Sequence, residues 1–310
     1  MKWVANYILT DFLGLSAVIK IADNDGVALH CDGHTLTLPN LFLSSADEAW
    51  LSHSTLPKLP LDQWALSDSG LDARITDETI PVLFGKPGFQ LDSEGNGNLD
   101  LDIFGSAFFM LSRYEEAVLT DRDDHDRFPA TASTAHKAGF LDRPIIDEYI
   151  EILWAAMNRV WPGVRRQRRQ STTLVSHDVD KPSLHAFYSL RRMLRISAGD
   201  LLKRRDLRRA VQGPWIWANS QRRLHPDDPY NTFEWIMDVS ERFGLTSAFY
   251  FICGRTHPTL DALYEIEHPA IRALMRRIHD RGHELGLHAS YNSYQDPEVI
   301  AAEAARMRHV

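Results

Sequence analysis

The second half of the chain alternates short apolar runs with amphipathic stretches. Residues 172–176, 246–252 and 284–287 are short runs of β-branched, aromatic and leucine residues, which predicts strands. Apolar positions recur at helical spacing over about residues 233–243 and 270–281, which predicts helices. Strands separated by helices at this spacing pair in parallel, so we expect an α/β fold. In such folds the chemistry lies beyond the carboxyl ends of the strands.

The first half of the chain has the pattern of a separate α+β domain. Short apolar runs such as residues 27–30 and 81–84 stand between Gly, Asn, Asp and Pro positions, which predicts strands joined by turns. Ser106 is a candidate N-cap for a helix to about residue 119, and Pro144 suits the first turn of a helix to about residue 160. We therefore predict a smaller α+β domain over residues 1–164.

Composition and charge support two globular domains. The chain has 310 residues, of which 44% are hydrophobic and 25% charged, which is typical of folded proteins. Residues 1–164 carry 11 Lys/Arg against 25 Asp/Glu, whereas residues 165–310 carry 23 against 17. The change falls at the basic cluster 165–169, which we interpret as a linker rather than a polyanion site. No nucleic-acid partner is inferred, and the second domain is expected over residues 171–310.

The cysteines and the apolar runs bear on the compartment. Cys31 and Cys253 are far apart and lack metal-like spacing, so we predict neither a disulfide framework nor a zinc–cysteine cluster. The first residues lack the pattern of a secretion signal. No stretch approaches the roughly 18 uninterrupted apolar residues of a membrane span. We therefore expect a cytoplasmic location.

A basic amphipathic insertion interrupts the second domain at about residues 184–223. Within it, residues 190–209 interleave eight Arg and Lys residues with leucines and other apolar residues. Such a segment can make weak contact with an anionic membrane surface or bind an acidic glycan. The more common arrangement packs the apolar side on the domain and leaves the charged side in solvent.

Candidate chemistry follows the first predicted strand of the second domain. Asp178 and Asp180 are two residues apart, so in an extended chain both side chains point to the same side. A divalent metal can acidify a bound water while a second carboxylate removes the proton, which requires two different carboxylates. The spacing alone allows either aspartate to bind the metal. His288, at the end of the strand 284–287, can complete the site.

Two motifs at these positions resemble a known enzyme family. His177-Asp178-Val179-Asp180 and the Gly-His-Glu-Leu-Gly-Leu-His segment at residues 282–288 resemble the first two motifs of the polysaccharide deacetylases of carbohydrate esterase family 4, in its His-Asp-Val-Asp branch. The resemblance covers about residues 171–310 and implies a distorted (β/α) barrel. It implies a hydrolase that removes acetyl groups from a saccharide or polysaccharide, by cleavage of amide bonds or, alternatively, O-esters. It places Asp178 as the general base and Asp180 and His288 as ligands of a divalent metal, with zinc as the expected ion.

The chain departs from the family pattern at two points. A second ligand histidine usually follows the first by four residues, and here that position is Asn292. An amide oxygen can bind a hard cation but is a poorer zinc ligand than imidazole, so the metal's identity stays open. His283 does not replace it, because in an extended strand residues 283 and 288 point to opposite faces. The later motifs are not found before Val310, so we expect a truncated chain with only the N-terminal part of the barrel.

Several alternatives remain at this point. A catalytically degenerate carbohydrate-binding or scaffold protein with the deacetylase fold is the main one. Asp-x-Asp also occurs in sugar-nucleotide transferases and in phosphatases, although Pro182 stands where those phosphatases have Thr. The loop at residues 92–103 resembles a calcium loop in part, but position twelve is Ile103, so we predict a hairpin turn. Residues 121–126 are likewise predicted to be a solvated loop. Residues 1–160 resemble the N-terminal region of the same branch, which implies no role.

Overall fold

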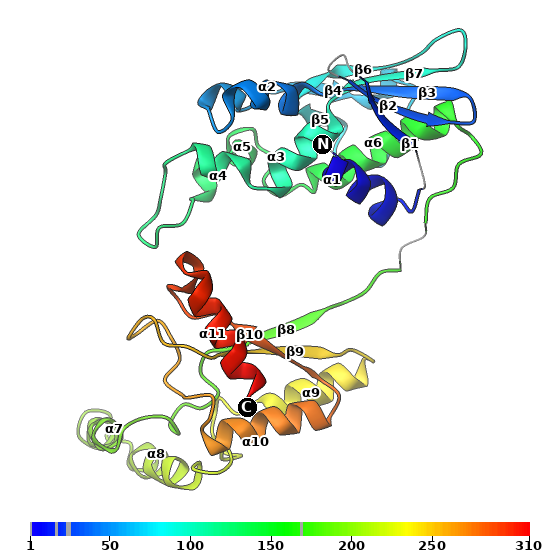
Figure 1. The fold of residues 1–310 in the computed structure, drawn as a ribbon. Helices are drawn as coiled ribbons and strands as arrows, with labels where there is room; N and C mark the ends of the chain where they lie inside the picture. The colour runs from blue at the N-terminus through cyan, green and yellow to red at the C-terminus, as the bar shows by residue number, and fades with distance from the viewer. Residues whose placement is uncertain (1, 16–17, 23–25, 168–169) are drawn as a thin grey trace. The chain divides into compact units, whose positions relative to one another are not determined.

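The protein consists of two compact units. The computed structural model describes residues 2–15, 18–22, 26–167 and 170–310. The chain divides into an N-terminal unit, Met1–Arg169, and a C-terminal unit, Gln170–Val310 (Figure 1). Arg168 and Arg169 of the predicted linker lie outside the described residues. None of the helices that the structure describes has the length and apolar character of a membrane span.

The N-terminal unit is built on a five-stranded sheet. Its strands lie in the order β1 (Val18–Ala22), β2 (Gly26–Cys31), β3 (His34–Pro39), β7 (Gly97–Leu101) and β6 (Gly85–Leu91). Neighbouring strands are antiparallel except β3 and β7, which are parallel. The helix α6 (Ile145–Val160) contacts β3 and β7 and packs on α3 (Ile103–Leu111). Leucine side chains of the sheet and isoleucine, leucine and methionine side chains of α6 form one buried core.

Short elements complete this unit. A second sheet pairs β4 (Asp62–Ala65) with β5 (Thr79–Val82) in antiparallel register. The remaining α-helices described in this unit are α1 (Lys2–Asn6), α2 (Leu41–Ala49), α4 (Tyr114–Val118) and α5 (Thr134–Lys137). The buried Tyr149 of α6 joins the edge of the small sheet to the core, because its hydroxyl donates to the carbonyl oxygen of Pro81 and accepts from the amide of Leu83. Burial raises the pKa of this hydroxyl, which stays protonated.

The helix for which Ser106 was the predicted N-cap is capped four residues earlier. Its N-cap is Asp102, whose side chain accepts a hydrogen bond from the amide of Gly105 at 2.8 Å. The Ser106 hydroxyl instead donates to the Asp102 carbonyl oxygen. The helix ends at Leu111, because Arg113 adopts a left-handed conformation with φ of 54° before α4 begins. The prediction of one helix to residue 119 was therefore wrong.

The C-terminal unit contains three parallel strands. They lie in the order β10 (Glu284–His288), β9 (Ser247–Ile252) and β8 (Val175–Val179). The predicted parallel pairing is confirmed by both registers. The connecting helices α9 (Phe233–Arg242) and α10 (Pro269–Asp280) share a buried core with the strands. The helix α11 (Pro297–Arg308) follows β10.

The strand predicted over residues 172–176 is shifted toward the motif. It runs from Val175 to Val179, so Asp178 lies within β8 and Asp180 directly after it. The shift follows from pairing with β9, where Asp178 lies opposite Tyr250 and Val179 opposite Phe251. The insertion after this strand contains two helices, α7 (Leu190–Leu202) and α8 (Leu207–Asn219) (Figure 1).

Candidate active site

Asp178, Asp180 and His288 meet at the carboxyl ends of the strands β8 and β10. The Nε2 atom of His288 lies 3.7 Å from Asp178 Oδ2 and 3.8 Å from Asp180 Oδ1. His288 lies opposite Ile252 in the register, and Asp178 lies opposite Tyr250. Because the strands are parallel, the two aspartates and a histidine about 110 positions later in the sequence reach one edge of the sheet. Both carboxylates are more than half exposed, whereas the imidazole is about one-third exposed.

A hydrogen bond of the His288 ring shows which ring nitrogen carries a proton. Its Nδ1 atom lies 3.0 Å from the carbonyl oxygen of Ala289, which can only accept a hydrogen bond. Nδ1 therefore carries a proton, and in the neutral ring Nε2 presents a lone pair toward Asp178 and Asp180. A lone pair and two carboxylates repel one another unless a proton or a cation lies between them. This donor set of one imidazole nitrogen and two carboxylates is one that a divalent metal accepts.

The distances from His288 Nε2 to the two carboxylates would suit a metal after small rotations of the aspartate side chains. Metal–ligand bonds of 2.0–2.2 Å place two ligands of one tetrahedral zinc about 3.4 Å apart. The observed separations of 3.7 and 3.8 Å are slightly wider. Across the described residues, no three or more His, Cys, Asp or Glu side chains are already drawn together as a metal centre. Binding would therefore require both carboxylates to turn inward, which their exposure allows.

Asn292 is held by the loop that follows β9. Its backbone amide donates to the Thr256 hydroxyl at 2.8 Å, and its side-chain nitrogen donates to the Thr256 carbonyl oxygen at 3.1 Å. Within the described part of the chain, it makes no hydrogen bond to Asp178, Asp180 or His288. The structure thus brings together three of the four predicted site residues, and Asn292 stands apart with its amide oxygen as the remaining donor atom.

A glycine lets an aromatic ring lie across the site face of the sheet. Gly286, two residues before His288, lies opposite Tyr250 in the register. A Cβ atom at this position would overlap the Tyr250 ring. Alternation along the strands places Asp178, Tyr250, Gly286 and His288 on one face. The opposite face of the sheet carries Phe249, Phe251 and other core residues. The candidate site residues therefore lie on the face that is turned away from this core.

Tyr264 fixes the backbone directly before Asp180. Its hydroxyl donates to the Val179 carbonyl oxygen and accepts from the Ile252 amide, both at 2.8 Å. It therefore joins the ends of β8 and β9. Burial raises the pKa of the Tyr264 hydroxyl, so it remains a hydrogen-bond donor. The sequence gives no signal for this role, because residue 264 lies outside both motifs.

Tyr264→Phe should lower the free energy of unfolding of the C-terminal unit by about 2 to 3 kcal/mol, because it leaves one buried amide and one buried carbonyl without a partner. Hydrogen exchange of the Ile252 amide measures this loss directly. Tyr230→Phe is the matched control, because the Tyr230 side chain is 44% exposed. Its effect should stay within about 0.5 kcal/mol. Equal protection of Ile252 in Tyr264→Phe and in the wild type would contradict the proposed role of the hydroxyl.

Three buried carboxylates position the loops around the site. Asp261 accepts hydrogen bonds from the amides of Thr256, His257 and Tyr291, and so connects the loops after β9 and β10. Glu303 of α11 accepts from the Ser290 amide. Asp228 accepts from the amides of Leu184 and Tyr230. Nothing in the sequence marks these residues, because each acts on backbone groups that only the tertiary fold brings near.

A small hollow of about 70 Å³ adjoins Asp180. Its lining includes Lys181, Phe187, Tyr188, Tyr230 and Leu263. The Tyr188 ring is covered by the Arg192 guanidinium at 4.2 Å, and the Tyr188 carbonyl oxygen accepts from the indole of Trp217. The insertion thus contributes the aromatic side chains of Phe187 and Tyr188 to one wall of the hollow. Motif reasoning missed it, although aromatic residues at both ends of the insertion were a visible signal.

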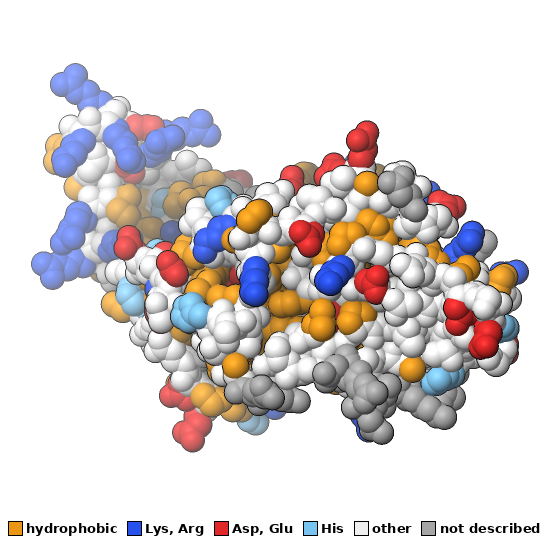
Figure 2. Space-filling model, turned by 90° about the horizontal axis from the view of Figure 1, so that it is seen from above, with side chains coloured by type: hydrophobic (Ala, Val, Ile, Leu, Met, Phe, Trp, Pro, Cys, Tyr) orange, Lys and Arg blue, Asp and Glu red, His pale blue; other side chains and the backbone are white. Residues whose placement is uncertain are grey.

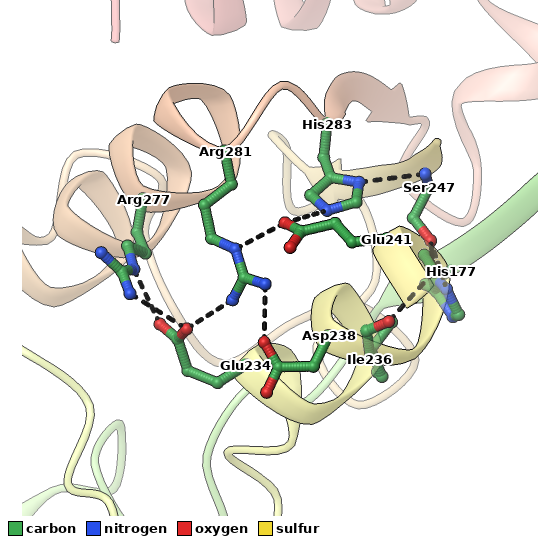
Figure 3. Close-up of polar contacts among 10 residues, drawn as sticks. His177, Glu234, Ile236, Asp238, Glu241, Ser247, Arg277, Arg281 and His283 are labelled. Atoms are coloured by element: carbon green, nitrogen blue, oxygen red, sulfur yellow. Dashed lines mark hydrogen bonds and ion pairs between the residues drawn. The ribbon is translucent and has the colours of Figure 1, made fainter. Parts of the chain in front are cut away.

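The two other histidines of the motifs belong to a polar network near the amino ends of the strands (Figure 3). His283 accepts from the Ser247 amide through Nδ1, and its Nε2 lies 3.4 Å from Glu241 Oε1. His177 stacks on Phe249 and lies 3.3 Å from the Ser247 hydroxyl. Burial, with a smaller contribution from the charge of His283, lowers the pKa of His177. As predicted, His283 is on the opposite face from His288.

Arg281 closes this network on the surface. Its guanidinium contacts the carboxylates of Glu234, Asp238 and Glu241 at 2.6–2.8 Å, which joins α10 to α9 (Figure 3). These carboxylates raise the pKa of Arg281 further. The network therefore stabilises the pair of helices α9 and α10 and lies at the opposite end of the strands from Asp178, Asp180 and His288.

The two acidic loops of the N-terminal unit are turns. Residues 92–96 form the tight turn between β6 and β7, in which the Asp92 side chain accepts from the amides of Glu94 and Asn96. The predicted hairpin is confirmed. Residues 121–126 are exposed, and Asp123 accepts from the amides of His125 and Arg127. These carboxylates hold loop backbone, as the prediction of a solvated loop requires.

The fold and the site together define an α/β protein with a carboxylate–histidine cluster at the carboxyl ends of a parallel sheet. The chain belongs to a family of unknown function, DUF7033, which matches residues 1–162. No curated protein and no solved structure matches the chain. The matched residues lie in the N-terminal unit, whereas the cluster lies in the C-terminal unit. The family assignment therefore names neither a substrate nor a reaction.

Proposed function

We propose that the protein is a metal-dependent hydrolase of the polysaccharide deacetylase type, which removes acetyl groups from a saccharide. The observation that carries the proposal is the approach of Asp178 and Asp180 to the His288 Nε2 lone pair at 3.7 and 3.8 Å. The position of these residues at the carboxyl ends of parallel strands supports it, because active sites of (β/α) barrels lie there. In this proposal the three strands of the C-terminal unit are part of such a barrel.

Each residue has a defined role in the proposed reaction. Asp180 and His288 would hold a divalent metal, for which we propose zinc, and Ala289 would keep the His288 ring in the required tautomer. When bound, the metal would acidify a water and polarise the acetyl carbonyl. Asp178 would accept the proton of that water as the general base. Asn292 would offer its amide oxygen from the edge of the site.

The hollow beside Asp180 supports a small acyl group attached to a sugar. A volume of about 70 Å³ suits a group of a few heavy atoms rather than a whole sugar ring. The exposed Tyr230 at its rim offers an aromatic face and a hydroxyl, a combination that can contact both the apolar and the polar sides of a saccharide. We therefore propose that the acetyl group enters the hollow while the sugar lies against Tyr230.

One observation favours a second candidate, a saccharide-binding protein without turnover. Asn292 stands where the family has an imidazole ligand, and its side chain is hydrogen bonded to Thr256. A site with only three protein donors, of which two are exposed carboxylates, binds metal more weakly than one with a further imidazole. In this alternative, Tyr230 and the hollow would bind the sugar and no acetate would be released.

Metal removal and restoration test the proposed function. Acetate release from acetylated chitin and xylan oligomers should fall to the background after chelation and recover when zinc is added. His288→Ala should prevent the recovery and lower zinc affinity by about 10- to 100-fold. His279→Ala, at an exposed position of α10, is the matched control and should behave as the wild type. Saccharide binding without acetate release at any metal concentration would overturn the hydrolase proposal and support the alternative.

A further inference from the structure

The insertion forms a helical hairpin with one buried side. The helices α7 and α8 pack against each other, and Met193 of α7 and Ile216 of α8 are almost fully buried. Gly213 brings the backbone of α8 close to Met193 and to His185. Ile196 and Trp217 are partly buried, whereas several other large apolar side chains of the hairpin are exposed.

The outward side carries large apolar side chains at helical spacing. On α7 these are Leu190, Leu194 and Leu201, and on α8 they are Leu207, Val211 and Trp215. The spacing of four or seven residues places each set along one face of its helix. The exposed fraction is 58% for Leu194 and 62% for Trp215. The common arrangement, in which such an apolar side packs on the domain, is therefore not the one observed. Isolated exposed leucines are ordinary, whereas contiguous rows of them mark an interaction surface.

Basic side chains flank these apolar rows. Residues 190–209 carry eight Arg and Lys against the two acids Asp200 and Asp206. Arg204 pairs with Asp200, and Arg209 lies 3.4 Å from Asp206. Most of the others make no ion pair with any described residue: Arg191, Arg195, Lys203, Arg205 and Arg208. Figure 2 shows Lys and Arg side chains gathered over the part of the C-terminal unit where Figure 1 places α7 and α8.

We propose that the hairpin α7–α8 is a docking surface for an anionic lipid bilayer. Helices that lie in a membrane interface combine Leu and Trp on one face with Lys and Arg at the flanks, which is the arrangement of this hairpin. Charge complementarity selects this occupant. A second copy of the chain would bring eight like charges against eight, and a soluble acidic glycan would leave the apolar rows in water. A bilayer with anionic headgroups can contact both the basic side chains and the apolar rows.

Binding to lipid vesicles tests this surface with the full chain. Affinity should be at least tenfold higher for vesicles of phosphatidylcholine with phosphatidylglycerol than for phosphatidylcholine alone. Each basic residue near an anionic leaflet contributes about a fivefold gain, so the triple variant Arg191→Gln, Arg195→Gln, Arg208→Gln should bind about 100-fold more weakly. The double variant Leu194→Gln, Val211→Gln should lose about tenfold even at low salt, when charge attraction is strongest.

A matched triple variant separates the hairpin from the overall charge. Arg159→Gln, Arg242→Gln and Arg276→Gln remove three exposed arginines elsewhere and should change vesicle binding by less than about twofold. An equal loss in this control would overturn the proposal. The proposal would also be overturned if Leu194→Gln, Val211→Gln left vesicle binding unchanged. That result would indicate a site that binds polyanions through charge alone. Self-association of the wild type without vesicle binding would assign the surface to a second copy. None of these outcomes depends on acetate release.

Discussion

Asp178→Asn is expected to lower the rate of acetate release by about 10²- to 10⁴-fold while zinc binding stays within about threefold of the wild type. The amide keeps the shape of the side chain but cannot accept the proton of the attacking water. Asp180→Asn should show the opposite pattern, with weakened zinc binding and an activity that partly recovers at high zinc concentration. Because both carboxylates lie at nearly equal distances from His288 Nε2, only such a comparison separates the base from the ligand.

The measurements are kcat with saturating zinc and the zinc dissociation constant for each variant. Asp227→Asn is the matched control, because Asp227 is an exposed aspartate in the same unit whose carboxylate lies outside the site. It should leave both quantities unchanged. Loss of zinc binding in Asp178→Asn together with its retention in Asp180→Asn would reverse the two roles. Wild-type rates of acetate release in both variants would show that neither aspartate takes part in the reaction.

Asp102→Ala is expected to lower the free energy of unfolding of the N-terminal unit by about 3 to 5 kcal/mol. The carboxylate is fully buried and accepts hydrogen bonds from the amides of Leu41, Phe42 and Gly105 at 2.8–2.9 Å. These amides belong to the first turns of α2 and α3, so one side chain caps two helices. Alanine would leave three N–H groups, two of them buried, without a partner.

The effect of Asp102 should depend on pH with a defined sign. Burial raises the pKa of Asp102 to about 6, although the three amide hydrogen bonds oppose the shift. Between about pH 4 and pH 6 the folded state therefore binds more protons here than the unfolded state. The part of the contribution of Asp102 that comes from its raised pKa is fully present below about pH 4 and is lost as the pH rises through about 6. The difference between the wild type and Asp102→Ala should widen as the pH falls through this range.

Unit-specific stability is measured by hydrogen exchange over residues 26–160 in increasing urea, because a chain of two units need not unfold in one step. Asp92→Ala is the control, because Asp92 also accepts from backbone amides but is fully exposed in its turn. Its cost should stay below about 1 kcal/mol, since water can replace the lost partner. Similar costs for Asp92 and Asp102 would show that burial is not the cause.

The sequence was sufficient for the residues that local pattern controls. Parallel pairing follows from the strand–helix–strand spacing, and the approach of Asp178 and Asp180 to His288 follows from their places at strand ends. Asp102 was missed because Ser106 is an equally good cap by residue type, and only the burial of Asp102 between two helices decides between them. Tyr264 and Asp261 were out of reach for another reason. Their partners are backbone groups of distant segments, which no periodicity encodes.

The same limit applies to the insertion. Helical periodicity identified an amphipathic basic segment, but it does not say whether the apolar side is covered. In the structure, Met193 and Ile216 are buried, whereas the leucine rows are exposed. The leucine rows stay exposed because the hairpin consists of only two helices. Whether an apolar face is buried depends on whether another element of the fold packs against it.

Tyr188 belongs to both the hollow and the hairpin. Its side chain lines the space beside Asp180, its ring is covered by Arg192 of α7, and its carbonyl oxygen accepts from Trp217 of α8. A ligand that orders the hairpin therefore also orders one wall of the hollow. Linkage is reciprocal, so a bilayer that tightens saccharide binding must itself be bound more tightly when the saccharide is present. Through Tyr188, the lipid surface would act as an effector of the site as well as a place of attachment.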